Sequence, residues 1–198
     1  RNHVLECLER AASADLEERA RLLSFYIVGG GPTGVEYAGA LAELVRLVLP
    51  AEYPDIPPSS VRIVLLEGGD RLLPALVPRL SEYARRELQR RGVEVQANRL
   101  VHDVAELDGG TLIWTAGVRP AELGGGHRVE VDEHFRIKGT VGAYAIGDVA
   151  RGTDRKGRDL PMTSPPAMQE GRHVARHILS EVRGRRLRPF RYRDKGTL

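Results

Sequence analysis

The most restrictive feature of the sequence is a glycine pattern that separates a short apolar run from a helical pattern. The apolar run covers residues 25–28, the glycines follow as Gly29-x-Gly31-x-x-Gly34, and apolar residues then recur at helical spacing over residues 35–49. This order predicts a buried strand, a tight turn and a helix, which is the setting of the dinucleotide fingerprint. We therefore expect an α/β fold that contains a Rossmann-like nucleotide-binding domain.

Each position of this turn has an expected task. Gly29 would make the turn, Gly31 would let the backbone approach a pyrophosphate, and Gly34 would let the helix pack closely on the strand. Pro32 and Thr33 complete the turn at the start of the helix. The helix N-terminus offers free N–H groups and a positive dipole end to phosphate groups. The alternative interpretation is a glycine-rich turn that binds nothing.

A second apolar run ends in an acid that could bind a ribose. Residues 61–67 predict a buried strand that ends at Glu67. In dinucleotide-binding folds, an acid at this point accepts hydrogen bonds from the adenosine ribose. Glu67 follows Gly34 at a longer distance than usual because residues 50–60 form a loop with four prolines. No arginine or lysine comes directly after Glu67, which favours NAD over NADP. The alternative is a solvent-facing acid at a strand end.

The remaining pattern extends this unit and then becomes less regular. Helical spacing over residues 78–91 and alternation over residues 93–97 complete a βαβαβ order, which predicts a parallel, right-handed sheet. Residues 101–104, 111–115 and 141–146 are strand-like. Residues 1–23 predict helix with a break at Ser13, and residues 164–182 predict another helix.

Composition excludes several classes of function. The chain has one cysteine, Cys7, so it forms no internal disulfide and no cysteine metal cluster. The net charge is only +3. The arginines near the C-terminus are better explained by a solvated face, or by contact with further parts of a larger protein, than by a nucleic-acid site. His173 and His177 share a helix face, but no acidic third ligand is obvious, so we expect no metal site. No nucleophile motif is present, so the chemistry must come from a cofactor.

Two acids have both a plain and a functional interpretation. Glu36 lies in the first turn of the fingerprint helix, where the helix dipole alone would stabilise a carboxylate. Asp148 follows a strand-like run and Gly147, and its carboxylate could accept hydrogen bonds from a polyol or cap a turn. The residues alone do not decide between these alternatives.

Four passages, taken in order, resemble a known family. They begin at Ile27, Trp114, Ala145 and Tyr192 and read Ile-Val-Gly-Gly-Gly-Pro-Thr-Gly-Val-Glu, Trp-Thr-Ala-Gly-Val, Ala-Ile-Gly-Asp-Val-Ala and Tyr-Arg-Asp-Lys-Gly-Thr-Leu. The run Arg-Leu-Leu-Pro from Arg71 also fits. The chain therefore resembles the pyridine-nucleotide-disulfide oxidoreductase superfamily, and within it most of all the type II NADH dehydrogenases.

The resemblance implies two nested dinucleotide domains, one for NAD(H) and one for FAD. Residues 24–122 resemble the NAD(H)-binding domain, a Rossmann-like three-layer β/β/α fold. Residues 1–23 resemble a helical linker from the FAD domain, and residues 123–198 resemble a partial FAD-binding segment. The implied reaction passes a hydride from NADH to FAD and then electrons to a quinone or another acceptor.

Individual site residues follow from the same resemblance. Those expected to contact NAD(H) are Gly29, Gly31, Pro32, Thr33, Gly34, Glu36, Glu67, Ala116 and Gly117. Gly147 and Asp148 would bind FAD, Asp148 at its ribityl–phosphate part. The implied catalytic residues are Glu36 near the nicotinamide and flavin, and Gln169 and Lys195 near the flavin ring, where quinone would be reduced.

The sequence also departs from the family pattern. The first FAD fingerprint and the C-terminal membrane segment are missing, which predicts a piece of a longer protein. By itself this piece should bind NADH weakly or not at all, hold no FAD firmly and show no turnover. Residues 104–112 are about ten residues short of the family's β-hairpin, and residues 123–126 are also short. Pro165 stands where the quinone-side motif has glutamine.

For the intact protein, the resemblance implies peripheral attachment to the cytoplasmic face of a membrane and allows a homodimer. Two other functions stay open. One is a different two-dinucleotide flavoprotein, such as a ferredoxin or nitrite reductase component. The other is a non-enzymatic NAD-binding interaction domain.

Overall fold

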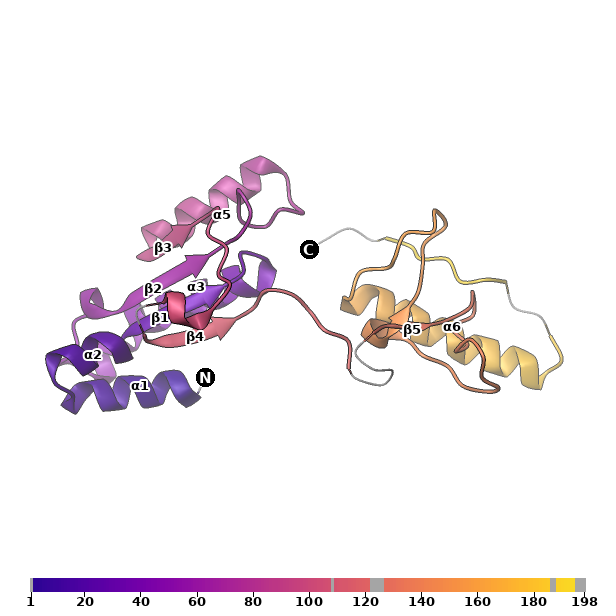
Figure 1. Cartoon of the computed structure of the whole chain (residues 1–198), viewed down its shortest axis with the longest axis horizontal. Helices are drawn as coiled ribbons and strands as arrows, with labels where there is room; N and C mark the ends of the chain where they lie inside the picture. The colour runs from indigo at the N-terminus through magenta and orange to yellow at the C-terminus, as the bar shows by residue number, and fades with distance from the viewer. Residues whose placement is uncertain (1, 108, 122–126, 186–187, 195–198) are drawn as a thin grey trace. The chain divides into compact units, whose positions relative to one another are not determined.

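The computed structural model describes residues 2–107, 109–121, 127–185 and 188–194. The chain divides into two compact units, Arg1–Gly117 and Val118–Leu198, each of which is described by itself (Figure 1). Within the described ranges, no helix is both long and apolar enough to cross a membrane.

The first unit is built on one parallel sheet. Its strands lie in the order β3-β2-β1-β4, and all neighbouring strands pair in parallel. Their bounds are Ser24–Val28 for β1, Arg62–Leu66 for β2, Val93–Gln96 for β3 and Thr111–Trp114 for β4. The two central strands are almost completely buried, which explains why they are continuous apolar runs rather than alternating ones. The predicted α/β, Rossmann-like fold is confirmed.

The helices of this unit begin and end where the sequence contains the usual signals. The α-helices are α1 (Asn2–Ser13), α2 (Leu16–Leu22), α3 (Pro32–Leu47), α4 (Leu49–Glu52) and α5 (Pro78–Arg90), and short 3-10 turns are η1 (Pro58–Ser60) and η2 (Val104–Glu106). Asp15 caps α2 by accepting a hydrogen bond from the Glu18 N–H at 2.9 Å. Prolines occupy the first positions of α3 and α5. The predicted break near Ser13 is confirmed, since it separates α1 from α2.

The two faces of the sheet are covered differently. One face packs against α1, α3 and α5 in a large apolar core that includes Phe25, Ile27, Ile63 and Leu65 from the strands. The opposite face packs against coil, which contributes Val101 and Leu107 over Tyr26, Val28, Val64 and Leu66. Within the described part of the first unit, the helical layer is therefore on one face only.

The predicted strand over residues 101–104 is wrong, because these residues form coil that leads into η2. The family's β-hairpin was expected to be short here, and the described residues contain no strand between β3 and β4. Glu106 explains part of the local structure, since its carboxylate accepts hydrogen bonds from the backbone N–H groups of His102 and Asp103. Such a side-chain cap competes with strand pairing.

The second unit has little regular structure besides one long helix. Its elements are β5 (Val129–Glu130), η3 (Gly147–Val149), β6 (Ala150–Arg151) and α6 (Ser164–Val182), and β5 pairs with β6 in parallel. A small core joins α6 to the segments around it, with Phe135 and Ala150 at its centre. The predicted helix over residues 164–182 is confirmed.

The predicted buried strand over residues 141–146 is wrong. Val141 is fully exposed, and only Tyr144 makes a bridge, to Arg136. Gly142 has a positive φ of 72°, which interrupts an extended strand. The apolar composition of this run reflects a few inward contacts rather than continuous pairing.

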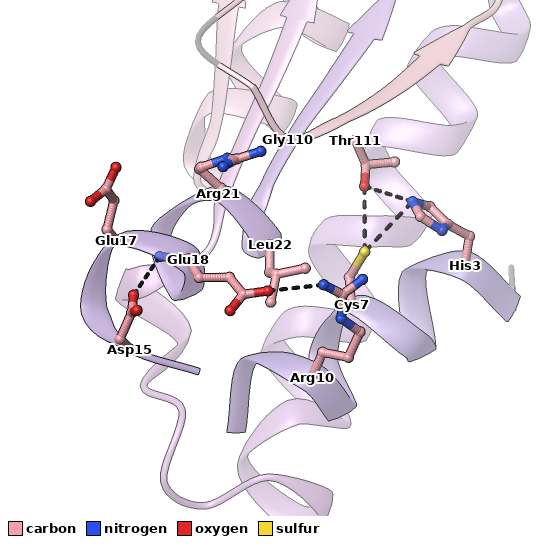
Figure 2. A pocket seen from close by; sticks show the side chains of 10 residues that line it. All are labelled: His3, Cys7, Arg10, Asp15, Glu17, Glu18, Arg21, Leu22, Gly110 and Thr111. Atoms are coloured by element: carbon pink, nitrogen blue, oxygen red, sulfur yellow. Dashed lines mark hydrogen bonds and ion pairs between the residues drawn. The ribbon is translucent and has the colours of Figure 1, made fainter. Parts of the chain in front are cut away.

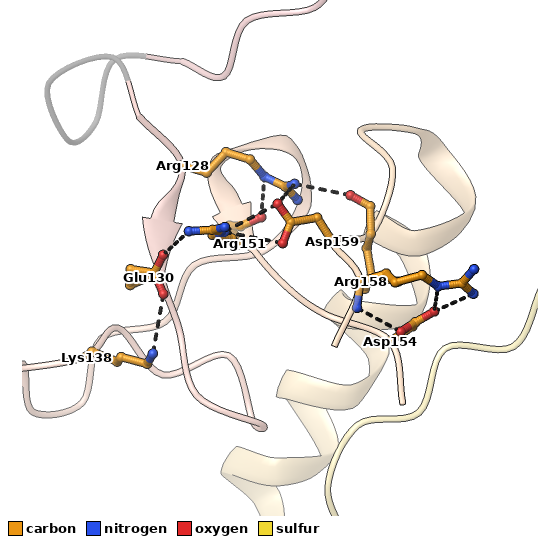
Figure 3. A network of polar contacts seen from close by, with 9 residues as sticks. Arg128, Glu130, Lys138, Arg151, Asp154, Arg158 and Asp159 are labelled. Carbon is orange, nitrogen blue, oxygen red and sulfur yellow. Dashed lines mark hydrogen bonds and ion pairs between the residues drawn. The ribbon is translucent and has the colours of Figure 1, made fainter. Parts of the chain in front are cut away.

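Ion pairs tie the β5–β6 pair to the neighbouring loops (Figure 3). Glu130 contacts both Lys138 and Arg151, and Arg151 also contacts Asp159. Most of these side chains are about half exposed, so each pair contributes little on its own.

Candidate dinucleotide site

Three turns meet at the carboxyl edge of the sheet in the first unit. Gly29 follows β1, Glu67 follows β2 and Thr115 follows β4, and these strands are neighbours. In open parallel sheets, ligands bind at this edge. The fold therefore brings together the glycine turn, the acid after the second strand and the residues after the fourth.

Gly29 and Gly34 are required by close packing within the turn. Gly29 has a φ of 110°, and a Cβ there would lie 2.8 Å from the backbone nitrogen of Ala116. A Cβ on Gly34 would lie only 1.8 Å from the carbonyl oxygen of Gly29. A side chain at Gly34 would force α3 away from the end of β1, in agreement with the packing task predicted for it.

No contact within the chain requires a glycine at position 31. A Cβ at this position would meet no atom within 4 Å. Gly31 is the N-cap of α3, and its carbonyl oxygen accepts a hydrogen bond from the Val35 N–H at 3.0 Å. The space where a side chain would lie is empty. The first turn of a helix leaves N–H groups without partners inside the helix. The space beside Gly31 therefore fits a negatively charged group of a ligand.

Glu67 is bonded to the glycine turn. One carboxylate oxygen accepts from the Gly30 N–H and the other from the Gly69 N–H, both at 2.6 Å. The side chain thus fixes the first turn against the end of β2. A carboxylate has about four acceptor positions, so two bonds leave capacity for ribose hydroxyls.

Gly30 and Thr115 hold this site together, and neither was among the residues predicted for it. Gly30 donates to Glu67, and its own carbonyl oxygen accepts from the Leu73 N–H at 2.8 Å. The Thr115 hydroxyl lies 2.8 Å from the carbonyl oxygen of Val28 and 3.1 Å from that of Gly29. The signal for Thr115 was its place directly after a strand, because a hydroxyl there can satisfy turn carbonyls.

The remaining predicted residues of this unit surround the turn. Pro32 and Thr33 are exposed at the start of α3, and Gly117 is exposed with a φ of 76°. Ala116 packs against Gly29, as described above. Glu36 is exposed on α3 and has no hydrogen bond or ion pair with any described residue.

In the second unit, Gly147 is fixed by a buried acid. Glu170 is 1% exposed, and its carboxylate accepts from the Gly147 N–H at 2.5 Å. Burial raises the pKa of Glu170, and the charge of Asp148 adds to this, whereas the Gly147 hydrogen bond and Arg128 oppose it. Glu170 was not predicted. Its signal was an acid spaced four residues from Pro166 and from Val174, on the same face of the helix.

Asp148 lies in η3 beside this anchor. Its side chain is half-buried and makes no hydrogen bond or ion pair with any described residue. A carboxylate in such a position can accept hydrogen bonds from a hydroxylated ligand.

Gln169 is used to hold the C-terminal segment. Its side-chain NH₂ donates to the Arg193 carbonyl and its side-chain oxygen accepts from the Arg193 N–H, both at 3.0 Å. This pair of bonds fixes the segment that precedes Lys195. The prediction for Lys195 falls outside the described residues, as do those for the short loop at residues 123–126.

A separate cavity of about 440 Å³ lies at the amino end of β4, between α1 and α2 (Figure 2). The Cys7 sulfur lies 3.6 Å from His3 Nε2 and 3.5 Å from the Thr111 hydroxyl. Arg10 and Glu18, which also line it, form an ion pair at 2.9 Å. This cavity is at the wrong end of the strands for the nucleotide. No group of three or more metal-ligating side chains in the described ranges is arranged to hold a metal ion.

The chain is similar to proteins of one family over most of its length. Residues 3–171 match the family described as pyridine nucleotide-disulphide oxidoreductase. The type II NADH:quinone oxidoreductase Ndh of Mycobacterium tuberculosis is 32% identical over 228 aligned positions, which cover 100% of this chain and 48% of that protein. The alignment is longer than the 198-residue chain, so the relative has segments that this chain lacks.

Further relatives agree. The external alternative NAD(P)H-ubiquinone oxidoreductase B2 of Arabidopsis thaliana mitochondria is 36% identical, over 79% of this chain and 31% of that protein. The structure of NDH2 from Plasmodium falciparum in complex with NADH superposes with a TM-score of 0.66 at 27% identity, over 75% of this chain and 36% of that chain. The chain spans about half the length, or less, of these relatives. By this match and by its glycine turn, the chain belongs to the pyridine nucleotide-disulphide oxidoreductase family.

Proposed function

We propose that this chain binds NADH within a flavin-dependent NADH dehydrogenase that delivers electrons to a quinone. The observation that carries the proposal is the glycine turn, in which Gly34 lets α3 pack against the end of β1 while the space beside Gly31 stays open. The names of the similar proteins support it, since they are NADH:quinone and NAD(P)H-ubiquinone oxidoreductases. When bound, FAD would accept the hydride of NADH and pass the electrons on.

The residues of the first unit have distinct tasks in this proposal. The turn at Gly31 and the N-terminus of α3 bind the pyrophosphate. Glu67 orients the adenosine ribose while it keeps the Gly30 turn closed. Ala116 and Gly117 line the nicotinamide pocket, and Glu36 lies close to the reacting ring.

The second unit supplies contacts for FAD. Asp148 accepts hydrogen bonds from the ribityl–phosphate part, and the Glu170–Gly147 bond holds the η3 turn in place. Gln169 and Lys195 belong to the quinone side, Gln169 through its hold on Arg193. Peripheral membrane attachment and a homodimer belong to the same proposal.

NADH titration against the 198-residue chain tests the nucleotide site. Amide resonances of Gly30, Gly31 and Gly117 should shift, and NMR detects this even when binding is weak. Gly31→Val should abolish the shifts and leave the fold intact, because its side chain extends into open space. Gly39→Ala, a matched glycine inside α3, should bind NADH as the unchanged chain does.

Equal binding by Gly31→Val would overturn the proposed site. So would shifts that map to the cavity between α1 and α2. Binding that remains tight without FAD would instead favour the alternative of a non-enzymatic NAD-binding domain.

A further inference from the structure

Three histidines stack on one another in the core of the second unit. His173 and His177 lie one turn apart on α6, and His134 comes from the turn after β5. The three rings are parallel within 12°, and the ring centre of His134 lies 4.2 Å from that of His177 and 5.4 Å from that of His173. The proposed nucleotide and flavin contacts use none of them.

The stack is built for neutral rings. His134 Nδ1 and His173 Nε2 share one hydrogen bond at 3.2 Å, which needs a proton on only one of the two nitrogens. His177 is 6% exposed, and both its ring nitrogens are buried without a hydrogen-bond partner. A positive charge on His177 would therefore be poorly solvated and would lie against the face of His134.

Charged and titratable groups face the stack from the 132–144 hairpin and from α6. They are Asp132, Glu133, Arg136, Tyr144, Arg176 and Glu181. The acids are largely engaged elsewhere. Asp132 accepts from the backbone N–H groups of His134 and Arg136, and Glu181 binds Arg136 and the Tyr144 hydroxyl.

Two acids lie close to the stack, but neither forms a hydrogen bond with a histidine ring. Glu133 is 3.7 Å from His134, and Glu181 is 3.8 Å from His177, both longer than a hydrogen bond. Burial, followed by the other histidines of the stack, lowers the pKa of both His173 and His177. The neutral state is therefore favoured in the folded unit.

The C-terminal segment, residues 188–194, is attached at this stack. The ring of Phe190 packs edge-on against His173, with centres 5.3 Å apart, and against Phe135 at 4.9 Å. The Phe190 N–H donates to the Glu133 carbonyl at 3.0 Å. The ring of Phe190 shields His173 from water, so a charge on His173 is better solvated when Phe190 has moved away.

We propose that the histidine stack is a proton-binding site that releases Phe190 from α6 when it becomes charged, while Gln169 keeps its hold on Arg193. Without Phe190, His173 is more exposed to water and binds protons more readily, whereas the attached form binds them at lower pH. Attachment is therefore complete above pH 6.5 and is lost as the pH falls from there toward the lowered values. The proposal does not depend on NADH or FAD.

Hydrogen exchange in the full 198-residue chain tests it. The exchange protection of the Phe190 amide, corrected for the intrinsic pH dependence of exchange, should be lower at pH 5 than at pH 7.5. The ring resonances of His173 and His177 should titrate below pH 6.5 over the same range. Protection that stays constant while these rings titrate would overturn the proposal.

A variant with a ring that cannot be protonated distinguishes the effect of charge from the effect of packing. His177→Phe removes one titrating ring and keeps an aromatic ring in the stack, so we expect the loss of Phe190 protection between pH 7.5 and pH 5 to become smaller. His102→Phe, at an exposed position in the first unit, should keep the full pH dependence. An unchanged pH response in His177→Phe would contradict the proposal, and His177→Leu provides the same test if the aromatic variant does not fold.

Discussion

Gly34 and Gly39 lie on the same helix, yet a methyl group would have opposite effects at the two positions. At Gly34 it would overlap the Gly29 carbonyl oxygen and lie 2.8 Å from the Thr115 hydroxyl. At Gly39 it would make an ordinary contact with Leu88 at 3.8 Å. The first glycine is required by the turn, whereas the second only adds conformational freedom to the unfolded chain.

Gly34→Ala is therefore expected to destabilise the first unit by about 1–3 kcal/mol or more, as overpacking does. Gly39→Ala should stabilise it by about 0.5–1 kcal/mol through helix propensity. Urea unfolding followed by circular dichroism measures both changes. A neutral effect of Gly34→Ala would mean that α3 can move away from β1 at no cost, and the turn geometry described above would be wrong.

Glu170 gives a prediction with a defined pH dependence. Its pKa is raised in the folded unit, so the unfolded chain loses this proton first as the pH rises. The folded unit is then progressively disfavoured from pH 4.5 up to the raised value. Glu170→Gln, which can still accept from the Gly147 N–H, should gain stability relative to the unchanged chain across this range.

Thermal unfolding of the two proteins between pH 4 and pH 7.5 checks this difference. A difference that is independent of pH would show that Glu170 is not buried as an acid. Asp159→Asn changes an exposed acid of the same unit and serves as the control.

At the scale of elements, prediction from sequence succeeded where one constraint dominates. The buried strands β1 and β2 lie between helices and turns that glycine and proline mark, and both were predicted to within a residue or two. Residues 101–104 and 141–146 also contain apolar residues but form no strand. Their structure depends on the Glu106 cap and on the positive φ of Gly142, two local features that apolar periodicity does not record.

Helix α5 contains an ion cluster whose contribution depends on pH and salt. Hydrogen bonds from Arg85 and Arg86 lower the pKa of Glu82 from 4.5 to about 2. The stabilisation is therefore complete above pH 4.5 and is lost as the pH falls toward 2. Glu82→Gln should slightly lower the melting temperature at pH 7, because these side chains are exposed and solvent screens them.

The decrease in melting temperature caused by Glu82→Gln should vanish near pH 2. It should also become smaller in 1 M salt, where charges are screened within a few ångströms. Glu17→Gln, on an exposed part of α2, is the matched control. A decrease that persists in high salt would point to helix propensity rather than to the ion pairs.

At the scale of the whole molecule, the sequence predicts the glycine turn of the candidate site but not the residues that anchor it. The glycine turn follows from local chain geometry, so its residues were recognisable in the sequence. The anchors Thr115 and Glu170 act on turns 86 and 23 residues away, and no short motif marks them. These long-range anchors can be identified only from the three-dimensional positions of the strands and of α6.

The proposed reaction divides into two half-reactions that two residues should affect separately. The side-chain amide of Gln169 forms two hydrogen bonds with the Arg193 backbone, and these position the segment before Lys195. In an enzyme that carries out the proposed reaction, Gln169→Ala should lower kcat/KM for quinone about tenfold, the cost of losing one to two hydrogen bonds. It should leave the rate of flavin reduction by NADH unchanged.

Gly31→Val should do the opposite, because the pyrophosphate approaches at that position. Anaerobic stopped-flow measurement of flavin reduction isolates the NADH half-reaction, and steady-state assays at varied quinone report the other. If Gln169→Ala slowed both half-reactions equally, its bonds to Arg193 would support the fold as a whole rather than the quinone side. Separate effects of the two variants would instead assign NADH to the first unit and the acceptor to the C-terminal segment of the second.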